Sequence, residues 1–93
     1  MRKDLLQPEK IEVIFTYTGL HKSVCLCGDF NDWSTESHCF KKQGGVWTIR
    51  VLLPPGRYRY AFLLDGEKWT PDPKALFQED DGFGMKNSIL IVE

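Results

Sequence analysis

The chain has 93 residues, of which 42% are hydrophobic and 27% are charged. This length supports one domain with a thin core, because so short a chain buries only about 60 to 65% of its extended surface. Twelve Lys and Arg against thirteen Asp and Glu give a net charge of −1. Such a balance provides no field to draw the chain to nucleic acid or to an acidic membrane surface, so we expect an uncharged partner.

The first ten residues are mixed and polar, and we expect an N-terminal arm over 1–10 followed by one domain over 11–93. The arm lacks the apolar stretch and the small-residue cleavage site of a signal peptide. No apolar run reaches the ~18 residues of a membrane-spanning helix. These features predict a cytoplasmic location.

Several short segments alternate apolar and polar residues, with turn-forming residues between them. No segment has the period of a helix. A long loop is expected over 71–86, where Pro71-Asp72-Pro73 interrupts regular pairing. The pattern predicts an all-β protein, an immunoglobulin-like (early-set) two-sheet antiparallel β-sandwich, with a small barrel as the alternative. The expected strands are 11–18, 23–27, a short edge strand over 38–41, 46–52, 57–64, 67–70 and 88–92.

The sequence gives little support for a metal site or for catalysis. Cys25 and Cys27 are two residues apart on one expected strand and are poorly placed to bridge, so we expect them and Cys39 to be free thiols. No cysteines have the spacing of a zinc site, and we expect no metal and no cofactor. The two histidines are expected at the surface, and the carboxylates of 71–86 in a solvated acidic loop. We therefore predict no catalytic residue and no enzyme.

Three aromatic residues, Trp33, Trp69 and Phe83, lie in expected loops or hairpin ends. A sugar ring presents a face of C–H groups that stacks on an aromatic ring while its hydroxyls stay free at the rim. The alternative is that these rings plug the ends of a thin sandwich. Asn87 and Lys68 are candidates for the polar rim, although either fits an ordinary loop residue. Trp47, within an alternating strand, is expected in the core.

Four motifs resemble carbohydrate-binding module family 48, which includes the glycogen-binding domain of the AMP-activated protein kinase beta subunit and N-terminal domains of isoamylase and branching enzymes. They are GDFNDWS at 28–34, YAFLLDG at 60–66, WTPDP at 69–73, and Asn87 ahead of an apolar strand. Their order and spacing match over about 11–92. The resemblance implies an immunoglobulin-like fold that binds α-1,4-linked glucans such as glycogen, starch or maltooligosaccharides. It also implies a glycogen-metabolising enzyme or a kinase as a protein partner.

The resemblance further implies that Trp33 and Trp69 cradle the glucan, that Phe83 pushes against it, and that Asn87 bonds its hydroxyls. Two positions depart from the glycogen-binding members: Ala61 replaces a lysine and Met85 replaces a threonine. Arg59 or Lys68 is a candidate replacement donor. The second hypothesis is therefore a protein-interaction or scaffold domain that has lost sugar binding. Indoles open on one surface favour sugar binding, whereas indoles buried under 71–86 favour packing.

Overall fold

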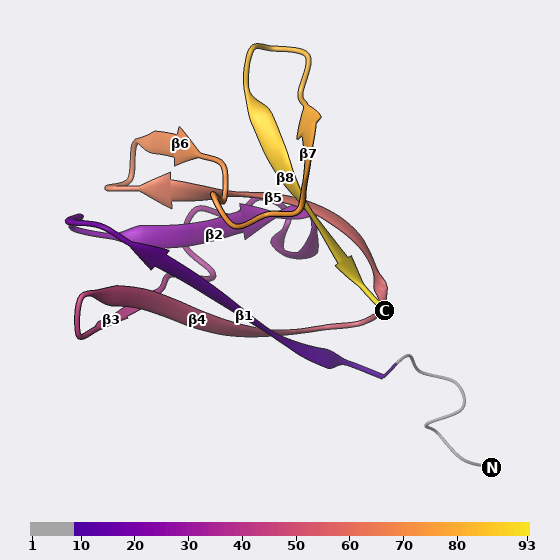
Figure 1. Cartoon of the computed structure of the whole chain (residues 1–93), viewed down its shortest axis with the longest axis horizontal. Coiled ribbons are helices and arrows are strands. Elements are labelled where there is room, and N and C mark those ends of the chain that lie inside the picture. Colours follow the sequence, from indigo (N-terminus) through magenta and orange to yellow (C-terminus); the bar gives the residue numbers. More distant parts are fainter. Residues whose placement is uncertain (1–8) are drawn as a thin grey trace.

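The computed structural model describes residues 9–93 (Figure 1), and residues 1–8 of the expected arm lie outside this range. The described chain forms strands and one 3-10 turn, η2 (Asp29–Asn31), without any α-helix. It therefore contains no helix that is long and apolar enough to span a membrane. The strands are β1 (Ile11–Thr18), β2 (Val24–Gly28), β3 (Lys41–Gln43), β4 (Val46–Leu53), β5 (Gly56–Leu64), β6 (Lys68–Thr70), β7 (Phe77–Asp80) and β8 (Lys86–Val92).

The strands form two antiparallel sheets, which confirms the predicted all-β sandwich. One sheet has the order β1-β4-β3, and the other has the order β2-β5-β8-β7, with β6 also paired to β5. Figure 1 shows the first sheet below the second, with the turn end of the β7–β8 hairpin extending beyond β5 on the side away from the first sheet. Alternation along each strand then gives every sheet one face toward the core and one outer face.

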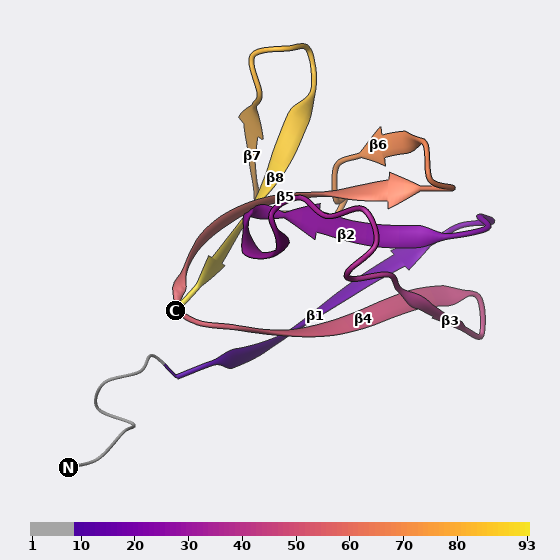
Figure 2. The same ribbon diagram turned by 180° about the vertical axis from the view of Figure 1, so that it is seen from behind.

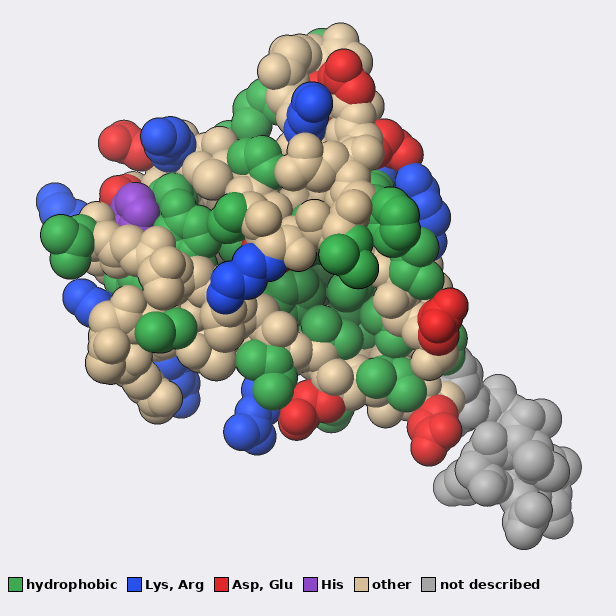
Figure 3. Space-filling model, in the orientation of Figure 1, with side chains coloured by type: hydrophobic (Ala, Val, Ile, Leu, Met, Phe, Trp, Pro, Cys, Tyr) green, Lys and Arg blue, Asp and Glu red, His purple; other side chains and the backbone are tan. Residues whose placement is uncertain are grey.

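The core lies between the sheets and contains Phe62 and Leu26, both 0% exposed. Trp47 belongs to it as predicted, and its indole donates to the backbone oxygen of Gly19 at 3.2 Å. The chain after β6 crosses one side of the sandwich, and Asp72 in this segment is buried. The Tyr60 hydroxyl donates to the Asp72 carboxylate at 2.7 Å. Figure 3 shows hydrophobic side chains gathered at the centre of this side, between β1 and the β7–β8 hairpin.

The three cysteines do not all stay free, so that prediction is wrong. The chain before β3 passes beside β2, where the backbone N–H of Leu26 donates to His38 and that of Phe40 donates to Val24. This pairing brings Cys39 opposite Cys25, and the two form a disulfide. Cys27 alone remains a thiol, and burial raises its pKa. In place of the expected strand over 38–41, Cys39 forms a single bridge to β2 of the five-stranded sheet. The chain then enters β3 of the three-stranded sheet.

The segment 71–86 is not one long acidic loop. It contains β7, which pairs with β8 from Phe77 opposite Ile89 to Asp80 opposite Lys86. Asp72 is buried, with its carboxylate also accepting the backbone N–H of Lys74 at 2.9 Å. Pairing with a neighbouring strand, which the composition of this segment does not reveal, explains the difference. The two histidines are likewise half-buried rather than fully at the surface.

Candidate functional site

A groove of about 240 Å³ lies on the outer face of the five-stranded sheet. Figure 2 shows β6 and the β7–β8 hairpin, which both contribute lining residues, rising on the same side of β5. Three of the predicted residues meet there with three others. The lining residues are Trp33, Ala61, Trp69, Asp81, Met85 and Asn87.

The pairing of β5 explains why these residues converge. β8 pairs with β5 as far as Ser88 opposite Tyr60, and β6 pairs with β5 from Thr70 opposite Phe62. The strands β6 and β8 therefore follow one another along the same edge of β5, with Ala61 at their junction. Because side chains alternate between faces, Ala61, Trp69 and Asn87 all point outward, and the small alanine leaves the floor of the groove open.

The two indoles form one wall of the groove. Their ring centroids lie 6.3 Å apart with 59° between the planes, so they meet as a tilted pair. Trp69 is 37% exposed and Trp33 is half-buried. Neither belongs to the core cluster between the sheets. Both rings therefore lie outside the core and keep part of their surface exposed.

The turn from Gly28 to Trp33 holds the first indole in place. A Cβ on Gly28 would lie 2.6 Å from the backbone oxygen of Arg59, so only glycine lets the turn lie this close to β5. Asn31 accepts the backbone N–H of Gly28 at 3.0 Å and donates to Leu26 at 2.9 Å. Asp32 and Trp33 have φ values of 55° and 58°, a left-handed conformation that is costly for residues other than glycine.

Asp29 connects this turn to the sheet. Its Oδ1 accepts the indole N–H of Trp33 at 3.1 Å, and its Oδ2 accepts the backbone N–H of Arg59 at 2.8 Å and the Arg59 Nε at 3.3 Å. Partial burial opposes ionisation of this carboxyl. The hydrogen bonds from Arg59 and Trp33 outweigh it and hold the pKa of Asp29 below its usual value of 3.8.

Asp81 organises the loop that forms the opposite wall. Its Oδ1 accepts the backbone N–H groups of Phe83 at 2.7 Å and of Met85 at 3.1 Å. Its own N–H donates to the backbone oxygen of Met85 at 2.9 Å. Met85 is thereby turned toward the groove, whereas Phe83 lies at the tip of the hairpin, 91% exposed and outside the lining.

The two candidate replacement donors also lie outside the lining. Lys68 pairs with Leu64, and Trp69 with Leu63, so alternation directs Lys68 away from the face that carries Trp69. Arg59 is on the groove face, two residues from Ala61, but its Nε is bonded to Asp29. Neither residue is among those that line the groove.

Sequence reasoning did not single out Asp29 or select Asp81 as a groove residue. The available signals were the spacing of four residues from Asp29 to Trp33 and the Asp-Gly-x-Gly pattern from Asp81, which is typical of a side chain that caps a turn. Chemically, the groove offers two aromatic faces and a thioether. It also offers the amide of Asn87 and the carboxylate of Asp81 to hydroxyl groups.

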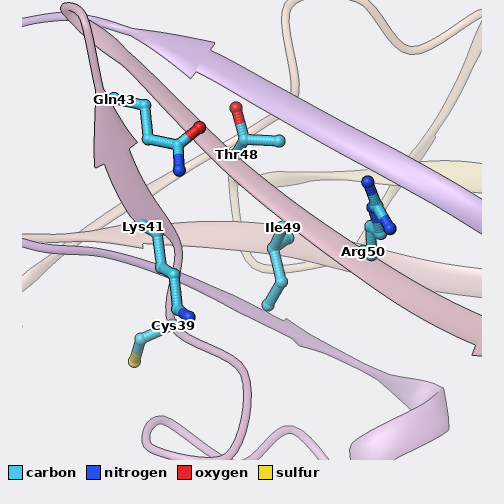
Figure 4. Close-up of a pocket in the computed structure, with 6 residues that line it drawn as sticks. All are labelled: Cys39, Lys41, Gln43, Thr48, Ile49 and Arg50. Atoms are coloured by element: carbon cyan, nitrogen blue, oxygen red, sulfur yellow. The ribbon is translucent and has the colours of Figure 1, made fainter.

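A second concavity, of about 380 Å³, lies beside the short strand β3. Figure 4 shows Cys39, Lys41 and Gln43 on one side of it and Thr48, Ile49 and Arg50 of β4 on the other. It has no aromatic ring, and its cysteine sulfur is engaged in the disulfide. Over residues 9–93, no His, Cys, Asp and Glu side chains cluster in a way that could hold a metal ion. The aromatic groove is therefore the candidate site.

Comparison with known proteins gives several relatives. The chain is 35% identical over 69 residues to Protein PTST homolog 2, chloroplastic, of Arabidopsis thaliana, covering 74% of this chain and 12% of that protein. It is 39% identical over 84 residues to the 5'-AMP-activated protein kinase subunit beta-1 of Homo sapiens, covering 86% and 28%. The chain thus spans less than a third of the length of either relative.

Among solved structures, the maltogenic amylase from S. marinus matches with a TM-score of 0.69 at 20% identity, over 92% of this chain and 14% of that one. At this identity the match supports the fold alone. The family model described as the glycogen recognition site of AMP-activated protein kinase matches residues 11–93. The chain therefore belongs to this family of non-catalytic carbohydrate-binding modules, which confirms its resemblance to carbohydrate-binding module family 48.

Proposed function

We propose that the groove binds α-1,4-linked glucans, with the Trp33 and Trp69 rings as the stacking surfaces for successive sugar units. The observation that carries the proposal is the tilted pair of partly exposed indoles, 6.3 Å apart, which line the groove together with an amide and a carboxylate. Stacking removes the C–H face of a pyranose from water, while its hydroxyls reach Asn87 and Asp81. Glycogen, starch and maltooligosaccharides all present such units.

The replacement of the family lysine by Ala61 changes the floor of this site rather than its aromatic wall. Loss of a charged donor removes one hydrogen bond to a sugar hydroxyl, and the open floor admits the ring more deeply between Trp69 and Met85. We therefore propose a site that relies on stacking more than on charge. Phe83, exposed at the hairpin tip, is proposed as the outer lip that contacts a bound chain.

The relatives support a module that brings another activity to a glucan. Several of these relatives are named as beta-1 subunits of a protein kinase. We propose that this module acts together with a kinase or a glycogen-metabolising enzyme. Attachment to a polymer would raise the local concentration of such a partner without new chemistry. The plant relatives are named as chloroplastic, so a cytoplasmic location stays a prediction.

The test is a titration of the folded chain with maltoheptaose, followed by tryptophan fluorescence and by calorimetry. Trp33→Ala and Trp69→Ala should each cost about 1 to 3 kcal/mol of binding free energy. Leu20→Ala, at an exposed position away from the groove, should bind as the unchanged chain does. Lys68→Ala should also bind normally, because that side chain points away from the groove. Arg59→Ala will show whether this residue supplies a donor.

The protein-interaction hypothesis keeps its support from Ala61 and Met85. Both replace polar residues of the glycogen-binding members, and both line the groove. A folded chain that shows no heat and no fluorescence change with millimolar maltoheptaose would favour that hypothesis over glucan binding.

A further inference from the structure

The outer face of the sheet continues beyond the groove toward the start of β7. Glu79 lies opposite Asn87, and Phe77 lies opposite Ile89, one step further along the same face. Arg59 also pairs with Ile89, from the other side of β8. The floor residues Ala61 and Asn87 are therefore followed, along this face, by a row that contains Arg59, Ile89 and Phe77.

The side chains on this part of the sheet interact with one another. The Arg57 guanidinium and the Glu79 carboxylate form an ion pair at 2.7 Å. Since Arg57 lies opposite Ile91 and Glu79 opposite Asn87, their pair spans the intervening Ile89, which is only 5% exposed. Phe77 stands beside this pair with 55% of its surface exposed. The face thus carries an aromatic ring next to a closed, half-exposed ion pair.

The groove is too small to hold a long ligand. Its volume of about 240 Å³ lies below the roughly 300 to 1,000 Å³ of pockets that enclose a drug-sized molecule. Only part of a glucan chain fits between Trp69 and Met85, and the rest must pass over neighbouring surface. The hairpin loop borders the groove at Asp81, whereas the row beyond Asn87 ends at Phe77, whose ring is 55% exposed.

We infer that Phe77 is an additional stacking position for the same glucan chain where it leaves the groove, with the Arg57–Glu79 pair facing the sugar hydroxyls. The inference rests on the proposed function of the groove and extends it to longer chains. An ion pair whose charges already satisfy each other can bond hydroxyls at its free edges without presenting a net charge. A glucan is uncharged and repeats the same sugar unit, so it presents the same C–H faces and hydroxyls to Phe77 and the ion pair as to the two indoles.

The consequence is a dependence of affinity on chain length. A short oligomer occupies only the groove, and a longer one also reaches Phe77. Removing the Phe77 ring should therefore weaken the binding of long oligomers by about threefold to tenfold, the size of one aromatic contact, and leave short oligomers unaffected.

The experiment measures dissociation constants of maltotriose, maltopentaose and maltoheptaose for the unchanged chain and for Phe77→Ala, Leu76→Ala and Trp33→Ala. Leu76 is the matched control, because it is the adjacent residue, is 88% exposed and lies outside the β7–β8 pairing. Thermal unfolding of each variant checks that it folds. We expect Phe77→Ala to lose the gain in affinity from maltotriose to maltoheptaose, Leu76→Ala to keep it, and Trp33→Ala to weaken all three sugars.

Equal affinities of Phe77→Ala and the unchanged chain for all three oligomers would overturn the inference while leaving the groove intact. A uniform loss in Phe77→Ala would overturn it as well, since the ring would then act on the groove itself. If the unchanged chain binds none of the sugars, the proposed function fails and the inference fails with it.

Discussion

The indole Nε1 of Trp33 donates to the Oδ1 of Asp29 at 3.1 Å, while the other oxygen of this carboxylate is held by Arg59 on β5. The orientation of this half-buried ring is thereby fixed by β5, a strand that does not contain Trp33. A ring that is held in place before the sugar arrives loses less freedom on binding, and affinity benefits accordingly.

The first prediction concerns Asp29→Ala, which removes the acceptor of the indole N–H. We expect the affinity for maltoheptaose to fall by about threefold to tenfold, or roughly 0.6 to 1.4 kcal/mol, because the lost bond orients the ring and does not itself contact the sugar. Trp33→Phe keeps an aromatic face but has no N–H to donate. In the Trp33→Phe background, Asp29→Ala should therefore cause little further loss. Equal losses in both backgrounds, measured by calorimetry, would show that Asp29 does not act through Trp33.

A second prediction concerns the stability of the fold at low pH. The folded chain holds the pKa of Asp29 below 3.8, through hydrogen bonds that outweigh its partial burial, and also lowers that of Asp65, chiefly through the backbone N–H of Lys22 and the ring of His21. A carboxyl with a lowered pKa stabilises the fold above its unfolded pKa, and this contribution is lost as the pH falls through the folded value. Stability should therefore decline below about pH 4.

Urea unfolding at several pH values, followed by tryptophan fluorescence, measures this decline. Asp29→Asn has no carboxyl to titrate, so its stability should depend less steeply on pH in the acid range than that of the unchanged chain. An identical acid profile in the variant would contradict the role given to Asp29.

The third prediction concerns the disulfide between Cys25 and Cys39, which are 14 residues apart in the sequence. Closing a loop of this length restricts the unfolded chain and stabilises the fold by about 3 kcal/mol in the loop-entropy model. A reducing agent should therefore lower the unfolding temperature of the unchanged chain. It should not change that of the Cys25→Ser, Cys39→Ser double variant. Labelling of all three cysteines after the chain is unfolded without a reducing agent would show that the disulfide is absent.

Much of the fold follows from local patterns in the sequence. The alternation over 57–64 predicts the central strand β5, and the pairs Gly44-Gly45 and Asp65-Gly66 mark turns in which all four residues have positive φ. Trp47 lies in the core because it alternates with Ile49 and Val51. These features depend on neighbours within a few residues, which a sequence displays directly.

The features that could not be predicted depend on which distant segments meet. Cys39 reaches Cys25 because the chain changes sheets just before β3, and nothing local indicates that crossing. β7 is an acidic edge strand whose partner is β8. In the site, the motifs predict Trp33, Trp69 and Asn87. The orientation of Lys68 follows from the register of β6 against β5, and the composition of the hairpin does not reveal it.

A fourth prediction separates the core tryptophan from the groove tryptophans. Trp47 is 7% exposed, and its Nε1 bonds to Gly19. Trp47→Ala should cost about 3 to 5 kcal/mol of unfolding free energy, because it leaves a large cavity between the sheets. Trp69→Ala, at a position that is 37% exposed, is the matched control and should leave the chain folded. Chemical unfolding followed by far-ultraviolet circular dichroism gives both values, and similar costs at the two positions would contradict the assignment.

The last prediction concerns the buried contact between Tyr60 and Asp72. The Tyr60 hydroxyl donates to the Asp72 carboxylate at 2.7 Å. Burial and then the bond and charge of Asp72 raise the pKa of Tyr60 well above its ordinary value. Asp72 also accepts the backbone N–H of Lys74, and its own N–H donates to Ser88. This residue therefore fixes the chain after β6 against both β5 and β8, directly behind the groove.

Tyr60→Phe keeps the ring but removes the donor, and a buried carboxylate then loses one of its hydrogen bonds. The expected cost is about 1.5 to 3 kcal/mol of unfolding free energy. The control is Tyr58→Phe, whose hydroxyl donates to the uncharged backbone oxygen of Pro54 at 2.6 Å and whose loss should cost nearer 1 kcal/mol. If the Tyr58 variant is as destabilised as the Tyr60 variant, the charge of Asp72 adds nothing. Because both variants leave the outer face of β5 unchanged, maltoheptaose affinity should stay constant in each.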